Sequence, residues 1–83
     1  MPLNQDSLSC DEKDFLKLLG YRIAYLRKVK NITQFELAER SGLSVATIAR
    51  LESSQLYCVS LVNLYRIGKS LGFSSPMELF DFH

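Results

Sequence analysis

Residues 33–52 constrain the fold of this chain more than any other segment, because two short helical patterns follow each other with only a glycine turn between them. Thr33 and Glu36 have the spacing of a capping box, which marks the start of a helix. Gly42 can adopt the positive φ that ends a helix tightly, and Ser44 is a suitable N-cap for the next one. The segment therefore predicts two helices joined by a single sharp turn.

Three more helices are predicted around this pair, so the expected fold is all-α, a compact domain of five helices. Capping residues and apolar spacing place the helices at about residues 10–30, 34–41, 45–53, 61–71 and 76–80. Their inward residues are expected to be Leu16, Leu19, Ile23 and Leu26, then Ile48 and Leu51, then Leu61, Leu64, Ile67 and Leu71. We expect a loose N-terminal arm at residues 1–8 and a single domain at residues 9–83.

Two residues near the first helix have distinctive backbone preferences. Gly20 lies inside that helix and is expected to weaken it by about 1 kcal/mol relative to alanine. Asn31 suits the left-handed conformation that ends a helix. The first helix is therefore expected to tolerate Gly20 and to end near Lys30.

The composition argues against an enzyme, a cofactor-dependent protein or a membrane protein. The single histidine is His83, and no glycine-rich phosphate loop is present, so no His-based catalytic site can be assembled. Cys10 and Cys58 are expected to be reduced, half-buried thiols, with a disulfide or a metal site as alternatives. No apolar run can span a membrane and no secretory signal is recognisable, so we expect a cytoplasmic protein.

Charge is unevenly distributed, although the net charge is only +1. Residues 1–20 hold two lysines against four acidic residues, whereas residues 21–55 hold six basic residues against three acidic ones. The positive segment coincides with the predicted helix pair, as expected for a surface that meets phosphate. On charge alone, a solvated surface of mixed sign is the alternative.

Two short helices joined by a sharp turn form a helix-turn-helix, which lays its second helix in the major groove of DNA. The start of that helix must be small or polar to enter the groove. We therefore expect base readout from Ser44, Val45, Ala46, Thr47, Ala49 and Arg50. Arg50 is the long hydrogen-bonding side chain of this set; it can bind guanine bidentately, with a phosphate contact as the alternative.

Phosphate contacts are expected from the rim of the same surface. Gln34 begins the first helix of the pair, where backbone N–H groups also face an anion. The other candidates are Arg22, Lys28, Lys30 and Ser53. Taken alone, each lysine or arginine is better interpreted as a solvated surface charge. The helix-turn-helix beside these residues is what favours a phosphate contact.

Four segments together resemble the XRE family, the Cro/C1-type helix-turn-helix domains of phage repressors and bacterial regulators. The segments are residues 20–28, 33–39, 44–52 and 60–72, and the match covers about residues 19–80. The resemblance implies a lambda-repressor-like fold and a bacterial or phage origin. It also implies base-reading positions at Val45, Ala46 and Arg50, a phosphate contact from Gln34, and a partly buried ion pair between Arg27 and Glu52.

Two features depart from the family pattern. Residues 53–59 contain neither the glycine usual after the glutamate nor the proline frequent before the next helix, which removes the usual basis for phosphate contacts there. The second helix of the pair also lacks glutamine and asparagine. Its base readout is therefore expected to be weak or to depend on DNA shape.

The function implied is a sequence-specific regulator of transcription, with repression expected, that binds double-stranded DNA. A homodimer on an inverted repeat is expected. The dimer interface would be formed by apolar residues late in the chain, whose alternative role is to anchor the core or the loops. These residues are Leu56, Tyr57, Val59, Phe73, Phe80 and Phe82. The alternatives are an antitoxin that regulates its own promoter and holds a toxin, and a protein-interaction module that has lost DNA binding.

Overall fold

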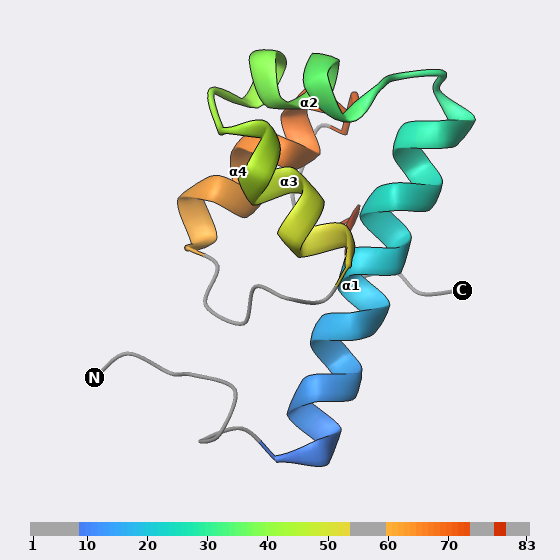
Figure 1. Cartoon of the computed structure of the whole chain (residues 1–83), viewed down its shortest axis with the longest axis vertical. Coiled ribbons are helices and arrows are strands. Elements are labelled where there is room, and N and C mark those ends of the chain that lie inside the picture. The colour runs from blue at the N-terminus through green and yellow to red at the C-terminus, as the bar shows by residue number, and fades with distance from the viewer. Residues whose placement is uncertain (1–8, 54–59, 74–77, 80–83) are drawn as a thin grey trace.

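The computed structural model describes residues 9–53, 60–73 and 78–79, and these ranges contain four α-helices (Figure 1). They are α1 (Cys10–Val29), α2 (Gln34–Ser41), α3 (Val45–Glu52) and α4 (Leu61–Ser70). α2 packs on both α3 and α4, and α3 also packs on α1. None of these helices combines the length and the apolarity needed to cross a bilayer. The prediction of an all-α fold is confirmed, and the first four expected helices are present.

The prediction of a fifth helix is wrong for the part that the structure describes. Glu78 and Leu79 form only a short 3-10 turn, and the rest of the expected helix lies outside the described residues. Leu79 is fully buried all the same. A capping pattern is a local signal, whereas so short a helix has too few hydrogen bonds to persist without tertiary support.

Each α-helix begins at the predicted serine or threonine cap, and two of these caps are complete capping boxes. The N–H groups of Ser9 and Thr33 donate to the carboxylates of Glu12 and Glu36 at 2.8 and 3.0 Å. The two hydroxyls accept the glutamates' own N–H groups at 3.1 and 3.0 Å. Donation from the backbone stabilises the ionised form, so the pKa of both glutamates lies below its ordinary value of 4.5.

The turns also follow the sequence pattern. Gly42 has φ 73° and its N–H donates to the carbonyl of Ala38, which ends α2 and redirects the chain into α3. Asn31 has φ 61° at the end of α1. Both residues therefore take the left-handed conformation expected of them, and a β-branched residue at either position would be strained.

The core joins all four helices and the connection between α1 and α2. Its buried apolar residues are Leu19, Ile23, Ile32, Leu37, Ala38, Ile48, Leu51, Leu64, Ile67, Leu71 and Leu79. Leu26 packs against this cluster and Leu16 is half-buried. The inward prediction is wrong for Leu61, which is 72% exposed, whereas Leu64, Ile67 and Leu71 are buried as predicted.

The prediction of half-buried thiols is also wrong where it can be compared. Cys10 is a free, exposed thiol, because it occupies the first turn of α1, where that helix extends beyond the other described elements (Figure 1). Cys58 lies outside the described residues.

Gly20 has a role that helix propensity does not reveal. It is buried where α1 crosses α3, and a Cβ built on it would overlap the carbonyl oxygen of Leu51. The missing side chain therefore lets two backbones approach closely. The modest loss of helix stability is the local cost of this tight crossing.

We predict that Gly20→Ala destabilises the domain by about 1–3 kcal/mol, because α1 and α3 must separate. Urea unfolding followed by circular dichroism measures the effect. Helix propensity alone predicts the opposite sign, a gain of about 1 kcal/mol. A more stable Gly20→Ala variant would therefore show that the crossing can relax at no net cost.

We also predict that Glu36→Gln reduces the loss of unfolding free energy that the domain undergoes as the pH falls from 7 to 3. The folded-state pKa of Glu36 is lowered, so its carboxylate stabilises the fold above the unfolded-state value of about 4.5, and this stabilisation is lost as the pH falls through the folded-state pKa. The change in urea midpoint between pH 7 and pH 3 should therefore be smaller in Glu36→Gln than in the wild type. Glu39→Gln removes a charge from the same helix outside the cap and serves as the control; an equal reduction by both variants would contradict the role of the cap.

Candidate nucleic-acid interface

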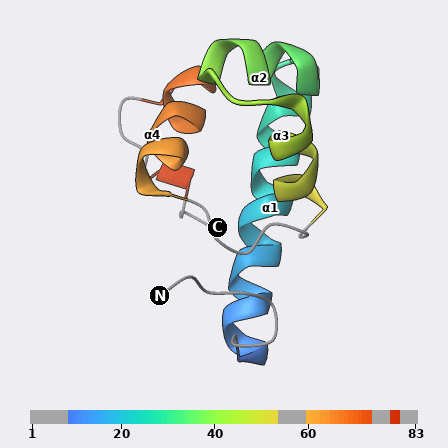
Figure 2. The same cartoon turned by 60° about the vertical axis from the view of Figure 1, so that its left-hand side comes forward.

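α3 turns one face to the core and the opposite face to solvent. Ile48 and Leu51 are buried at 0% and 4% exposure, whereas Val45 keeps 39% of its surface exposed. Ala46 and Arg50 are exposed beside Val45. Figure 2 shows α2 across the top of the molecule and α3 descending from it beside α1. The outward face of α3 is therefore open in the described part of the structure.

The other three expected base-reading residues are more constrained. The Ser44 hydroxyl accepts the N–H of Thr47 at 3.0 Å, and the two hydroxyl oxygens lie 2.8 Å apart. These contacts fix the first turn of α3, so they compete with contacts to an outside ligand. Thr47 and Ala49 are half-buried. The open face is therefore formed by Val45, Ala46 and Arg50, with Ser44 at its edge.

A partly buried ion pair fixes α3 to α1. Arg27 donates from Nε to Glu52 Oε2 at 2.7 Å and from Nη2 to Glu52 Oε1 at 3.0 Å. The two side chains keep only 11% and 8% of their surface exposed. The remaining terminal nitrogen, Nη1, donates to the carbonyl of Ile32 at 2.9 Å. The hydrogen bonds to Glu52 raise the pKa of Arg27 above its already high value, so the guanidinium stays charged.

Gln34 extends this network to α2. Its Nε2 donates to Glu52 Oε1 at 3.0 Å. Glu52 therefore accepts three hydrogen bonds, two from α1 and one from the first residue of α2. One carboxylate at the end of α3 joins the three helices, which sets the orientation of α3 relative to the start of α2.

The expected phosphate candidates do not all lie together. Gln34 begins α2, Lys28 lines a small hollow just before it, and Ser53 caps the end of α3. The structure does not place Arg22 with them, because its Nη2 donates to the carbonyl of Glu78 at 3.1 Å. Lys30 also points elsewhere, since its Nζ lies 3.6 Å from a Cβ built on Gly72.

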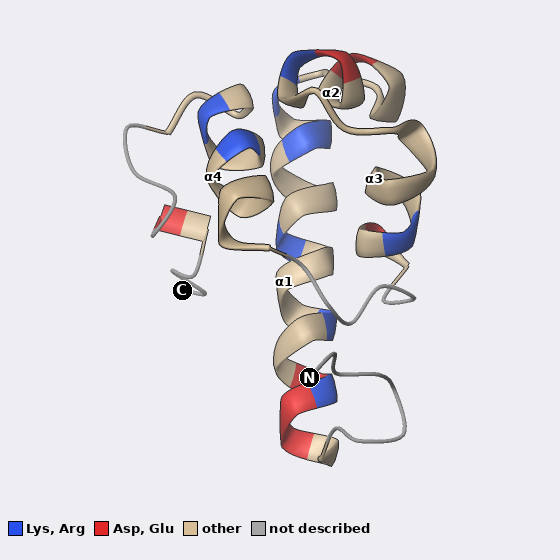
Figure 3. Ribbon diagram, turned by 90° about the vertical axis from the view of Figure 1, so that its left-hand side faces the viewer, with Lys and Arg blue, Asp and Glu red and all other residues tan. Residues whose placement is uncertain are grey.

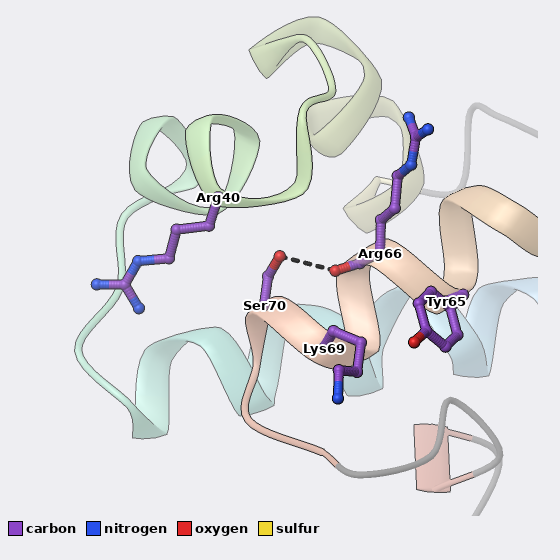
Figure 4. A pocket seen from close by; sticks show the side chains of 5 residues that line it. All are labelled: Arg40, Tyr65, Arg66, Lys69 and Ser70. Atoms are coloured by element: carbon purple, nitrogen blue, oxygen red, sulfur yellow. Dashed lines mark hydrogen bonds between the residues drawn. The ribbon is translucent and has the colours of Figure 1, made fainter.

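A basic groove between α2 and α4 was not expected from the sequence. It is an open hollow of about 420 Å³ lined by Arg40, Tyr65, Arg66, Lys69 and Ser70 (Figure 4). The four α4 residues have a spacing that places them on one face of a helix, which the sequence could have revealed. Their approach to Arg40 is a tertiary contact, which no spacing could reveal. Figure 3 shows basic residues on α4 and α3, and the acidic residues of α1 gathered at its distant first turns.

We predict that breaking the Arg27–Glu52 pair from either side costs about 3–5 kcal/mol of unfolding free energy, because the remaining charge stays buried without its partner. Arg27→Met and Glu52→Leu are the single variants, and the double variant should lose less than the sum of the two. Urea unfolding at neutral pH measures all three.

Lys28→Met is the matched control, because it removes an exposed charge from the neighbouring position. Its expected change is within about 0.5 kcal/mol. Strict additivity of the Arg27 and Glu52 variants would show that the two side chains are not energetically coupled.

Comparison with known proteins places this geometry in one family. The family model described as helix-turn-helix matches residues 23–79, more than half of the chain. An uncharacterised HTH-type transcriptional regulator, y4dJ of Sinorhizobium fredii, is 36% identical over 61 residues, which cover 74% of this chain and 78% of the relative.

Two solved structures share the fold, each with a TM-score of 0.74. The restriction-modification controller protein C.AhdI from Aeromonas hydrophila is 37% identical, and the match covers 78% of this chain and 96% of that one. The hypothetical transcription factor NHTF from Neisseria is 25% identical, with 95% and 88% covered. The chain therefore belongs to the XRE-type helix-turn-helix family of DNA-binding transcriptional regulators.

Proposed function

We propose that this chain regulates transcription by binding double-stranded DNA sequence-specifically, with α3 in the major groove, and that it acts as a repressor. The observation that carries the proposal is the outward face of α3, where Val45, Ala46 and Arg50 are exposed while Ile48 and Leu51 anchor the helix from behind. Small side chains at the start of the helix leave room for base edges. The chain acts by binding rather than by catalysis, and in the cytoplasm.

Arg50 supplies base discrimination in this proposal. Its guanidinium is exposed on the last turn of α3, where it can reach O6 and N7 of a guanine with two hydrogen bonds. Val45 and Ala46 present methyl groups, which suit contact with a thymine methyl. Three side chains can contact only a few bases directly, so part of the sequence specificity depends on the shape of the DNA.

Gln34 and its neighbours hold the phosphate backbone. One of the two N–H bonds of the Gln34 side-chain amide serves Glu52, and the other is able to donate to a phosphate oxygen. The exposed Lys28 and Ser53 flank this region, and the first N–H groups of α2 add positive potential. The hydrogen bond to Glu52 fixes the position of Gln34 relative to α3. The phosphate contact of Gln34 and the base contacts of α3 are therefore kept at a fixed position relative to each other.

The DNA site is proposed to be an inverted repeat bound by two copies of the chain. Repression follows if such a site overlaps a promoter, because the bound protein excludes the polymerase. Two recognition helices on one face of the duplex require a spacing of about 34 Å, one turn of DNA.

We predict that Arg50→Ala weakens binding to the cognate site by about 1–3 kcal/mol and weakens binding to random DNA much less. Gln34→Ala should weaken both to a similar extent, because a phosphate contact carries no sequence information. The cognate site is first selected from random DNA, and fluorescence anisotropy titrations at several salt concentrations then give both affinities.

Arg66→Ala removes a guanidinium from α4, away from the open face of α3, and should leave the ratio of the two affinities unchanged. Equal losses on both DNAs in Arg50→Ala would reduce Arg50 to a phosphate contact. An affinity for DNA without steep salt dependence would instead point to a protein-interaction module.

A further inference from the structure

The basic groove between α2 and α4 has no part in the proposed function. It is lined by Arg40 from the last turn of α2 and by Tyr65, Arg66, Lys69 and Ser70 from α4. No residue from the open face of α3 is among them. Its volume of about 420 Å³ falls within the range of about 300–1,000 Å³ that is usual for small-molecule sites. The groove is therefore large enough to hold a ligand of its own.

Three cations line the basic groove without a counterion among the described residues. Arg40, Arg66 and Lys69 are exposed, and the ion pair recorded in the described part of the chain is that of Arg27 with Glu52. None of the described residues that line the groove is acidic. Positive charge gathered in this way favours an anionic ligand.

Glu36 lies one turn before Arg40 on α2, but its carboxylate is used elsewhere. It accepts the N–H of Thr33 at 3.0 Å in the capping box. The hydrogen bonds of this cap are the main cause of the lowered pKa of Glu36, and the charge of Arg40 is only a minor cause. The Arg40 guanidinium therefore remains available to a ligand.

Helix dipoles explain only part of this cluster. Arg40 and Lys69 lie in the last turns of α2 and α4, where a cation interacts favourably with the negative end of the helix dipole. Arg66 lies one turn before the end of α4, and Tyr65 carries no charge. The presence of all four side chains around one hollow therefore points to a ligand rather than to the helix ends alone.

The cationic groups of the basic groove do not converge on one point. In Figure 4 the side chains of Arg40, Arg66 and Lys69 leave the two helices in different directions. A single small anion therefore cannot contact all three, whereas a ligand with several anionic groups along its length can. A chain of phosphate groups has this form, and a guanidinium can bind two oxygens of one phosphate.

Tyr65 adds an aromatic surface beside the cations. It is 49% exposed and lies one helical turn before Lys69 on the same face of α4. A planar base can stack on such a ring whatever its identity. Ser70 contributes less, because its hydroxyl already donates to the carbonyl of Arg66 at 2.7 Å and a phosphate oxygen needs a donor.

We propose that the basic groove binds a nucleoside polyphosphate, whose phosphate groups contact Arg40, Arg66 and Lys69 and whose base stacks on Tyr65. None of the described lining residues is aliphatic, so the groove lacks the apolar pockets that usually anchor a peptide. The contacts are exposed and screened by salt, so a dissociation constant of about 10 µM to 1 mM is expected at low salt. The proposal does not depend on the proposed DNA role.

The experiment is an NMR titration of the whole ¹⁵N-labelled chain without DNA, at low salt and without divalent metal. The two probes are ATP and inorganic triphosphate, because both carry the phosphate chain and only ATP carries a base. Both should cause saturable shift changes centred on residues 40 and 65–70. ATP should bind about fivefold more tightly or better, since stacking adds to the phosphate contacts.

Four variants separate the contributions of the lining residues. Arg40→Ala and Lys69→Ala should each weaken the binding of both probes about two- to fivefold. Tyr65→Leu should reduce the affinity for ATP to that for triphosphate and leave the affinity for triphosphate unchanged. Ser70→Ala should change neither, because the hydroxyl donates within its own helix.

Arg50→Ala is the matched control, because it removes an exposed guanidinium from the open face of α3. Its affinity for both probes should equal that of the wild type. The amide spectrum of each variant establishes that the fold is kept.

Three outcomes would overturn the assignment of the basic groove. They are the absence of saturable shifts with either probe up to about 5 mM, shifts centred on residues 45–50, and a loss in Arg50→Ala as large as that in Arg40→Ala. Equal affinities of the wild type for ATP and triphosphate would overturn the role of Tyr65 and favour an inorganic ligand. Because DNA is absent, failure here leaves the proposed function untouched, and failure to bind DNA leaves this proposal untouched.

Discussion

The salt bridge between Arg27 and Glu52 is the interaction on which the rest of this domain depends. It joins α1 to the last residue of α3 with two hydrogen bonds, and further bonds add the carbonyl of Ile32 and the amide of Gln34. A bidentate pair fixes direction as well as distance. Since both groups are nearly buried, either one left without the other would be costly.

The same network connects the stability of the fold to the geometry of the candidate site. Glu52 ends the helix whose opposite face carries Arg50, and Gln34 begins the helix that lies beside it. The end of α3 and the start of α2 are thus held by one carboxylate. Gly20 completes the arrangement, because its missing side chain allows the backbone of α1 to approach that of α3 closely.

Local signals predicted the helices well wherever the chain itself supplies the hydrogen bonds. The caps at Ser9, Thr33, Ser44 and Ser60 act within one turn, and the turn at Gly42 needs only a permissive residue. The errors arise where another element decides. Leu61 fits the apolar spacing of α4 but is not buried by the residues that the structure describes. Leu79 is fully buried, although Glu78 and Leu79 form a 3-10 turn where the capping pattern predicted an α-helix.

The sequence by itself determined the helix starts and the sharp turn, because these depend on residues at most a few positions apart. It predicted the exposure of Val45, Ala46 and Arg50 on α3, but it also expected Thr47 and Ala49 on that face, and these are half-buried. It also implied the ion pair, through a resemblance rather than through spacing. The tertiary structure alone decided that Gly20 faces Leu51, that Arg22 turns to Glu78 and that Arg40 joins α4. These contacts join residues far apart in the chain, and their positions depend on how whole helices pack, which no local pattern encodes.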